Sequence, residues 1–241
     1  MKLESTPVIL LFAALPSELR PLRRKLNLEL NKPAAVPVLA DQMIVAVASG
    51  IGQSCCTAEL DLCLQKYQPQ LVINLGLAGG LKRHINAGTV VRVRTVCDPN
   101  GNRIHIDDPK AHGTLLTVDK SANTTAMKAE LYTKHQADIV DMESYYIAQR
   151  LKATGTRLRI IRAVSDPADF AFPAGLLGLI SLKGYIKYLH TISFFITHPK
   201  HIPCAAKLNT MSKLALNNLV DTVMDILNEE NIMADHGTIR L

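Results

Sequence analysis

The chain has 241 residues, of which 48% are hydrophobic, and it carries a formal net charge of +6. This length and composition predict one large α/β domain that spans residues 1–241 around a substantial core. There is no tryptophan, few residues are aromatic, and the basic residues are dispersed apart from Arg20 to Lys25. A nucleic-acid partner is therefore not expected, and the short basic run is interpreted as a solvated helix face.

The chain contains five cysteines, at Cys55, Cys56, Cys63, Cys97 and Cys204. Their number is odd and no pair has CxxC spacing, so neither a disulfide framework nor a zinc site is expected, and a reducing cytoplasm is favoured. The loop residues His84, His105 and His112 match no metal-ligand motif either. The first apolar run is interrupted by Pro16 and Glu18, which indicates a buried strand and not a secretory signal.

Strands and helices alternate in the first third of the chain: strand Val8 to Ala13, helix from Pro16, strand Met43 to Ala48 and helix Gln53 to Tyr67. Glu18 lies in the first turn of the first helix, where it faces the end of the sheet. Its alternative role is that of an acidic residue favoured by the helix dipole. The turn Ser49 to Gly52 is glycine-rich, and backbone N–H groups of such turns can approach an anion or a sugar closely.

The run Leu71 to Leu75 is almost wholly apolar, as expected for a strand in the middle of a parallel sheet. It continues into Gly76 to Leu81, where three glycines within five residues predict tight or positive-φ backbone close to a bulky group. The spacing is not that of a dinucleotide-binding turn. Further on, the pattern predicts a strand over Thr89 to Val96, a surface loop over Asp98 to Gly113 and a helix over Lys120 to His135.

The segment from Ala137 to Asp169 reads as strand, helix and strand, with acidic residues where each strand ends. Because ligands bind beyond the carboxyl ends of strands in open α/β sheets, Glu143 and Asp166 are expected to share a pocket. An ionised glutamate can accept two hydrogen bonds from ribose hydroxyls, and a carboxyl in a half-apolar pocket can donate a proton to a leaving group. The pattern fits equally well with helix caps and turn formers, which is the favoured interpretation of Asp141 alone.

Residues 170–203 are expected to be an apolar and basic insertion or a covering segment. A final amphipathic helix is predicted over residues 205–228, with a frayed tail from Glu229 to Leu241. Ala174 to Ile196 is apolar but is interrupted by Lys183, Lys187 and His190, which argues against a membrane-spanning helix. Two interpretations remain: a helix folded over the domain, which is the favoured one, or a basic amphipathic patch that meets lipid or a greasy substrate. His198 to Pro203 is expected to be a linker.

Four blocks, in order, resemble the nucleoside phosphorylase and nucleosidase superfamily, above all the methylthioadenosine/S-adenosylhomocysteine nucleosidases. They are Ala13 to Leu19 (AALPSEL), Ser49 to Gly52 (SGIG), Asn74 to Leu81 (NLGLAGGL) and the pair VDMES and RAVSDPAD. The resemblance implies a three-layer α/β/α sandwich with a mixed central sheet, acting on a purine nucleoside as a cytoplasmic homodimer. No metal or organic cofactor is implied.

Matching positions imply two catalytic residues: Asp166 protonates the purine nitrogen N7, and Glu18 activates the attacking water. The same resemblance implies substrate-binding roles for other matched positions, namely Glu143 at the ribose hydroxyls, Met142 against the sugar, Arg162 on the water or anion side, Ser165 beside the acid and Gly79 beside the base. These roles fit together chemically, since glycosidic cleavage proceeds through an oxocarbenium-like state aided by a protonated leaving group.

Two binding positions depart from the family pattern. Leu77 replaces a small hydroxyl residue, and Lys120 falls where the relatives place an aromatic residue that stacks on adenine. Recognition has therefore shifted, or another residue stacks on the base. The arginines that hold phosphate in hexameric phosphorylases are missing, which favours water as the nucleophile. A phosphorylase that uses phosphate as co-substrate, through Arg20 or Arg162, and a non-catalytic nucleoside-binding protein remain alternatives.

A narrower resemblance links the chain to the hopanoid-associated phosphorylase group, which is associated with removal of adenine from adenosylhopane. It rests on Val96 to Gly101, Gly113 to Leu116, Phe172 to Leu177, Lys183 to Tyr185 and His198 to Pro203. It implies that residues 174–196 form a wall for a greasy substrate or contact a membrane surface, with the protein peripheral to the inner membrane.

Overall fold

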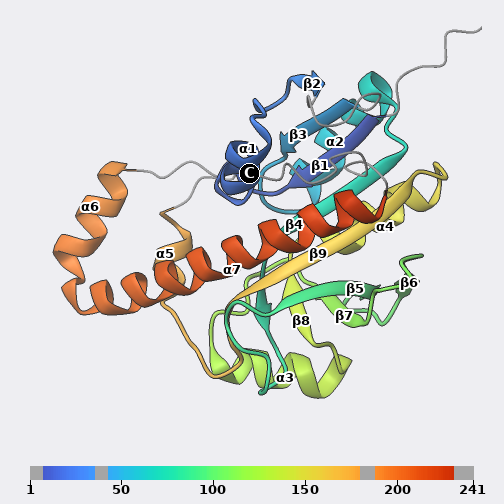
Figure 1. Cartoon of the computed structure of the whole chain (residues 1–241). Helices are drawn as coiled ribbons and strands as arrows, with labels where there is room; N and C mark the ends of the chain where they lie inside the picture. The colour runs from blue at the N-terminus through green and yellow to red at the C-terminus, as the bar shows by residue number, and fades with distance from the viewer. Residues whose placement is uncertain (1–7, 36–42, 180–187, 231–241) are drawn as a thin grey trace, which may run out of the picture.

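A computed structural model describes residues 8–35, 43–179 and 188–230 of the chain. Its described strands form a single mixed sheet flanked by helices (Figure 1). The strands are β1 (Val8–Ala13), β2 (Pro33–Ala35), β3 (Met43–Ala48), β4 (Leu71–Gly80), β5 (Val90–Cys97), β6 (Arg103–His105), β7 (Gly113–Thr117), β8 (Ile139–Asp141) and β9 (Arg157–Asp166). Most of them follow the spatial order β2-β3-β1-β4-β8-β7-β5-β6, and β9 pairs with both β4 and β5.

The four strands β3, β1, β4 and β9 run parallel, so their carboxyl ends meet at one edge of the sheet. The strands beyond β9 lead back to β4. Strand β9 pairs antiparallel with β5, and β5 pairs parallel with β7. Strand β7 in turn pairs parallel with β8, and β8 pairs antiparallel with the end of β4. Gly79 of β4 consequently lies between Val140 of β8 and Asp166 of β9. The topology thus brings the ends of β8 and β9 together around one glycine.

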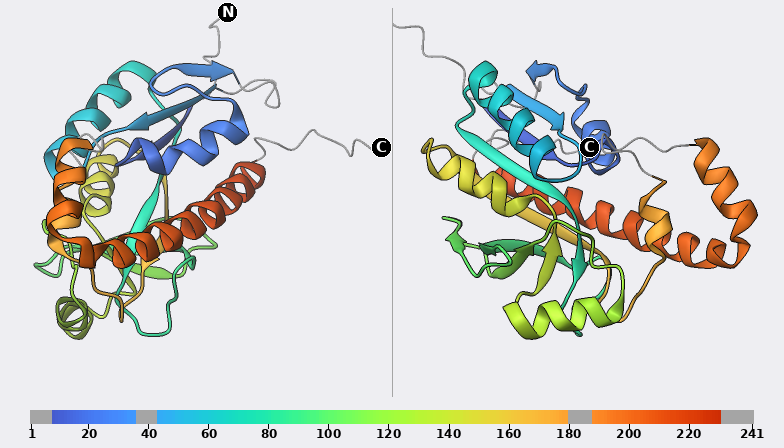
Figure 2. Two further views of the ribbon diagram at one scale, coloured as in Figure 1. Left: turned by 90° about the vertical axis from the view of Figure 1, so that its left-hand side faces the viewer. Right: turned by 180° about the vertical axis from the view of Figure 1, so that it is seen from behind.

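Helices cover both faces of the sheet, and the predicted three-layer α/β/α arrangement is confirmed (Figures 1 and 2). Helices α1 (Pro16–Leu26) and α7 (Ile202–Glu229) pack on one face, and α2 (Gln53–Tyr67) and α4 (Ser144–Lys152) pack on the other. Successive strand residues point to opposite faces, so Leu11 packs with Leu19 and Leu219 whereas Phe12 packs with Leu60 and Ile147. Helix α3 (Thr125–His135) lies below this sandwich near β8 (Figure 1).

The long helix α7 has two different halves. Its C-terminal half buries an apolar stripe against the sheet. In its N-terminal half no described residue from Ile202 to Leu214 is buried, and this N-terminal half projects beyond the sheet beside α6 (Tyr188–Thr197; Figure 2).

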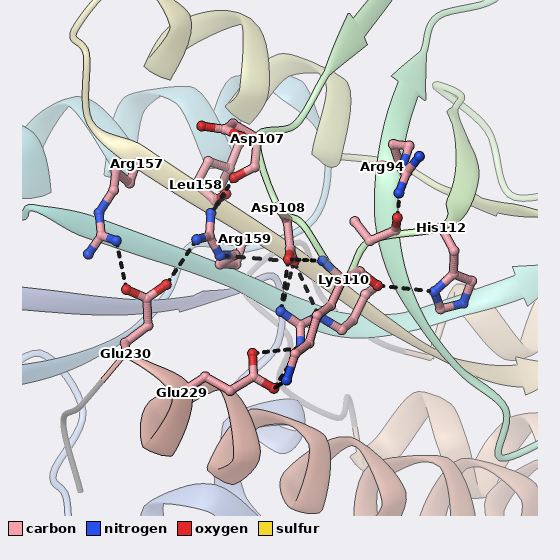
Figure 3. Close-up of polar contacts among 12 residues, drawn as sticks. Arg94, Asp107, Asp108, Lys110, His112, Arg157, Leu158, Arg159, Glu229 and Glu230 are labelled. Carbon is pink, nitrogen blue, oxygen red and sulfur yellow. Dashed lines mark hydrogen bonds and ion pairs between the residues drawn. The ribbon is translucent and has the colours of Figure 1, made fainter. Parts of the chain in front are cut away.

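The C-terminal end of α7 carries Glu229 and Glu230, which the helix dipole disfavours. Figure 3 shows the cations that offset this charge. Arg92 and Lys110 contact Glu229 at 2.9 Å, and Arg157 and Arg159 contact Glu230 at 2.6 and 2.9 Å.

The glycine-rich run after Leu75 is not the predicted turn. Strand β4 continues through Gly80, and Gly76, Gly79 and Gly80 are absent from the described residues with positive φ. The expectation of a nearby bulky group is correct, because a Cβ on Gly76 would lie 2.7 Å from Glu18 Oε1 and one on Gly79 would lie 3.2 Å from Asp166 Oδ2. These positions lack side chains so that carboxylates can lie directly against the strand.

Other predicted boundaries also change. The expected loop from Asp98 to Gly113 contains β6 and leads into β7, and the helix expected from Lys120 begins at Thr125. The expected linker at His198 to Pro203 is a 3₁₀ turn at Pro199–His201 followed by the start of α7. Within Ala174 to Ile196 the structure contains α5 (Ala174–Leu177) and α6, with residues 180–187 outside the described part, as is the tail from residue 231. No described helix is long and apolar enough to cross a bilayer.

Candidate active site

A cavity of about 250 Å³ lies at the carboxyl ends of the parallel strands. Most of the residues predicted for the site line it: Glu18, Leu77, Gly79, Met142, Glu143, Ser165 and Asp166. They come from the start of α1, the end of β4, the turn after β8 and the end of β9. The remainder of the lining is largely apolar. The structure therefore brings together the carboxyl groups of Glu18, Glu143 and Asp166, which lie 125 and 23 residues apart in the sequence, as expected for strand ends that meet at one edge. Asp141 lines the same cavity.

Glu18 is held against the backbone on both of its oxygens. Its Oε2 accepts a hydrogen bond from the Leu15 N–H at 2.8 Å, and its Oε1 accepts one from the Leu77 N–H at 2.7 Å. Burial raises the pKa of Glu18, while these two hydrogen bonds and the charge of Arg162 oppose the rise. A carboxylate fixed in this way, with its basicity increased by burial, is suited to take a proton from a bound water.

Glu143 stands at the N-terminal end of α4, and its Oε1 accepts a hydrogen bond from the Gly52 N–H at 2.8 Å. This bond explains the role of the glycine-rich turn after β3, whose Gly52 has a φ of 88°. Burial, reinforced by the charge of Asp141, raises the pKa of Glu143 to about 8. Near neutral pH the side chain of Glu143 can therefore donate a hydrogen bond when it is protonated and accept hydrogen bonds when it is ionised.

The raised pKa of Glu143 makes the stability of the protein depend on pH. The pKa of Glu143 rises from 4.5 in the unfolded chain to about 8 in the folded protein. The folded state is therefore most stable below pH 4.5, and this stability is lost as the pH rises from 4.5 through about 8. Glu143→Gln keeps the oxygen that Gly52 contacts but cannot ionise. We expect this variant to melt about 5 °C above the native protein near pH 9, with the difference shrinking towards pH 5.

Melting curves measured across this pH range test the expectation, with Glu130→Gln as the control. Glu130 lies on an exposed face of α3, so its replacement is expected to leave the pH dependence unchanged. Equal pH dependence of the native protein and Glu143→Gln would show that Glu143 does not titrate as a buried group.

Asp166 is bound on both oxygens by neighbouring side chains. Its Oδ2 lies 2.7 Å from Nζ of Lys128, and its Oδ1 accepts a hydrogen bond from the Ser165 hydroxyl at 2.5 Å. Burial raises the pKa of Asp166, and the charge of Lys128 opposes this rise. Lys128 is not predictable from the sequence, because a lysine in an ordinary helix is usually solvated and its partner lies 38 residues away in the sequence.

Arg162 and Lys120 do not line the cavity, which corrects their predicted positions. The Arg162 guanidinium is buried and bound by Asp141 Oδ2 at 3.0 and 3.1 Å, by Asn74 Oδ1 at 3.0 Å and by Ser144 Oγ at 2.8 Å. A buried guanidinium needs such partners, and they come from three elements that the sequence does not show to be adjacent. Lys120 is exposed.

Several lining residues were not predicted. Val118, Ser121 and Ala122 line the cavity on either side of Lys120 in the sequence, and Phe172 lines it from the segment after β9. Leu208 and Ser212 reach it from the projecting half of α7. The periodicity of α7 pointed only to a core-facing stripe, so it gave no signal for this contact.

The fold is that of nucleoside phosphorylase-like α/β proteins. Residues 8–110 match the family model described as the phosphorylase superfamily. The 5′-methylthioadenosine/S-adenosylhomocysteine nucleosidase of Bacillus pumilus is 27% identical over 166 residues, which cover 54% of this chain and 71% of that protein. The resemblance to the nucleoside phosphorylase and nucleosidase superfamily, predicted from the four sequence blocks, is thereby confirmed.

Solved structures agree on the fold. The Helicobacter pylori 5′-methylthioadenosine/S-adenosylhomocysteine nucleosidase superposes with a TM-score of 0.68 at 12% identity, covering 94% of this chain and 100% of that chain. The futalosine hydrolase of the same organism gives a TM-score of 0.68 at 12% identity, covering 93% and 98%. At these identities the likeness shows a shared fold.

Proposed function

We propose that the protein is a purine nucleosidase that hydrolyses the N-glycosidic bond of an adenosine-type, 5′-substituted nucleoside and releases adenine. The observation that carries the proposal is the convergence of the buried carboxyl groups of Glu18, Glu143 and Asp166 on one cavity with largely apolar walls. The names of the relatives, which are nucleosidases, support the same reaction class.

The three carboxyl groups divide the reaction between them. Asp166 donates a proton to N7, so that the base leaves as a neutral molecule. Glu143 binds the ribose hydroxyls next to Met142, which packs on the sugar. Glu18, held by two backbone N–H groups, takes a proton from the water that attacks the anomeric carbon. Its negative charge also stabilises the positive charge that develops on the sugar in the transition state.

Water is the proposed nucleophile. Phosphate would need fixed cations, and the described residues that line the cavity include no lysine or arginine. Arg162, a candidate phosphate ligand, is already bound by Asp141, Asn74 and Ser144. Neither a metal nor an organic cofactor has a part in the proposed reaction.

The base and the 5′ group are proposed to meet different walls. Phe172 is buried in the lining near Ala122 and is the proposed replacement for the stacking aromatic residue that Lys120 does not supply. Ile51, Leu208 and Leu15 provide an apolar wall on the side of α7. Such a wall accommodates a methylthio group and equally a lipid-bearing substituent of the adenosylhopane type. In the second case, the apolar segment 174–196 is proposed to shield the lipid at a membrane surface. The protein is further proposed to act in the cytoplasm as a homodimer.

The test is release of base by the purified native protein from methylthioadenosine, adenosine, futalosine and adenosylhopane. Release of adenine from any of the adenosine-type substrates supports the proposal, and the relative kcat/KM values identify the 5′ group. Release from futalosine alone would contradict the proposed base. Calorimetric binding of these nucleosides without release would instead establish a nucleoside-binding protein.

A further inference from the structure

Lys128 is a fully buried lysine whose ammonium group contacts the short segment from Asp166 to Phe170. Its Nζ lies 2.7 Å from Asp166 Oδ2 and donates to the carbonyl oxygens of Pro167 at 2.8 Å, Phe170 at 3.0 Å and Asp166 itself at 3.1 Å. Its side chain is 0% exposed. An ammonium group has three protons, so these oxygens satisfy all of its donors. Such an arrangement fixes both the chain after β9 and the plane of the Asp166 carboxyl group.

The contact makes the two oxygens of Asp166 unequal. Oδ2 already accepts a hydrogen bond from the Lys128 ammonium, which lowers its basicity, so the acidic proton is favoured on Oδ1. Oδ1 contacts the Ser165 hydroxyl, which has a second partner in the carbonyl oxygen of Ala78 at 3.4 Å. When Asp166 is ionised, the hydroxyl of Ser165 can donate to Oδ1. When Asp166 is protonated, the hydroxyl can donate to Ala78 instead, so that the proton on Oδ1 is free to be given to a substrate.

We propose that Lys128 is a positioning residue for the general acid: it holds Oδ2 of Asp166 and so places the transferable proton on Oδ1. This inference rests on the proposed function of Asp166. The proton passes from Oδ1 to N7 as the glycosidic bond breaks, leaving a carboxylate that is paired with the Lys128 ammonium. After the base has left, solvent takes the proton from Glu18 and returns one to Oδ1, so both the base and the acid are regenerated.

The charges around Asp166 set the expected pH dependence. Lys128 from α3 is the charged side chain that contacts it, Ser165 is its uncharged neighbour on β9, and Gly79 faces it from β4. Glu18, Asp141 and Glu143 line the same cavity from α1, from the end of β8 and from the start of α4. The Lys128 charge lowers the pKa of Asp166 against the effect of burial. Removing that charge raises the pKa, so activity that needs protonated Asp166 persists to higher pH.

The experiment compares the native protein with Lys128→Met by pH profiles of kcat/KM and by the carbon-13 chemical shift of the Asp166 carboxyl group. We expect kcat to fall about 100-fold, as for a misplaced catalytic group. We expect the titration of Asp166 to move upward by about 1 to 3 pH units. Lys134→Met, at an exposed position of the same helix, is the control and is expected to match the native protein.

A double-mutant cycle separates positioning from a general structural role. In the Asp166→Asn background the acid is already absent, so adding Lys128→Met is expected to change kcat less than about 3-fold. A further loss comparable to that in the native background, or an unmoved titration of Asp166, overturns the proposal. If Lys128→Met does not fold, as judged by circular dichroism, the neutral Lys128→Gln, which retains two N–H donors, takes its place. If the native protein releases no base, the proposed function fails, while the Asp166 titration still decides whether Lys128 controls this carboxyl group.

Discussion

Asp166→Asn is expected to lower kcat for release of adenine about 10²- to 10⁴-fold, which is the usual contribution of a general acid. The amide has the shape of the carboxyl group and keeps an oxygen for Lys128, but it has no acidic proton to give to N7. The base must then leave as an anion from an apolar cavity, which is unfavourable. We expect KM to change much less than kcat, because Glu143, the proposed ligand of the ribose, is unchanged.

The measurement is steady-state release of adenine by the native protein, Asp166→Asn and Asp169→Asn. Asp169 lies three residues further along the chain and is exposed, so Asp169→Asn serves as the matched control and should retain native activity. A riboside of 4-nitrophenol sharpens the test, because its leaving group needs no protonation. Asp166→Asn should lose far less activity on this substrate than on an adenine nucleoside, and an equal loss on both would contradict the role of acid.

Glu18→Gln is the second change with a large expected effect, again a fall in kcat of about 10²- to 10⁴-fold. Glutamine cannot take a proton from water, and its amide NH₂ would face the N–H of Leu15 or of Leu77, so one of the two hydrogen bonds would be lost. The native protein should also lose activity as the pH falls through the pKa of Glu18, which burial raises.

Rates of base release and melting temperatures of Glu18→Gln are compared with those of Glu29→Gln. Glu29 is exposed and forms a surface ion pair with Lys32, so its replacement should affect neither activity nor folding. A folded Glu18→Gln protein with activity within about 3-fold of the native value would remove Glu18 from the proposed chemistry, since general-base contributions are far larger.

The sequence predicted the parts of this structure that depend on local pattern. The periods of the apolar residues located β1, α1, β3, α2 and β9 closely, because strands and amphipathic helices leave repeats of two and 3.6 residues. Glu143 and Asp166 were placed in one pocket because strand ends of an open sheet meet at one edge. Glu18 and Gly52 were identified near the same edge, although neither their hydrogen bonds nor their partners were predictable.

The features missed by the sequence depend on contacts between distant residues. A buried lysine such as Lys128 cannot be told from a solvated one until Asp166 and its neighbouring carbonyl groups are placed around it. The same holds for Arg162, whose partners Asp141 and Asn74 lie on other strands. The glycines of β4 suggested a turn, but they are needed because carboxyl groups pack directly on an extended strand.

We propose that the cavity lined by Glu18, Glu143 and Asp166 cleaves a purine nucleoside with water. The most direct measurement follows release of base by ultraviolet absorbance and the fate of phosphate by phosphorus-31 NMR, in the same sample of native protein and nucleoside. Adenine should appear at the same rate with and without phosphate, and the phosphorus spectrum should stay that of inorganic phosphate. A new ribose 1-phosphate signal that grows with the released base would contradict hydrolysis and identify the protein as a phosphorylase.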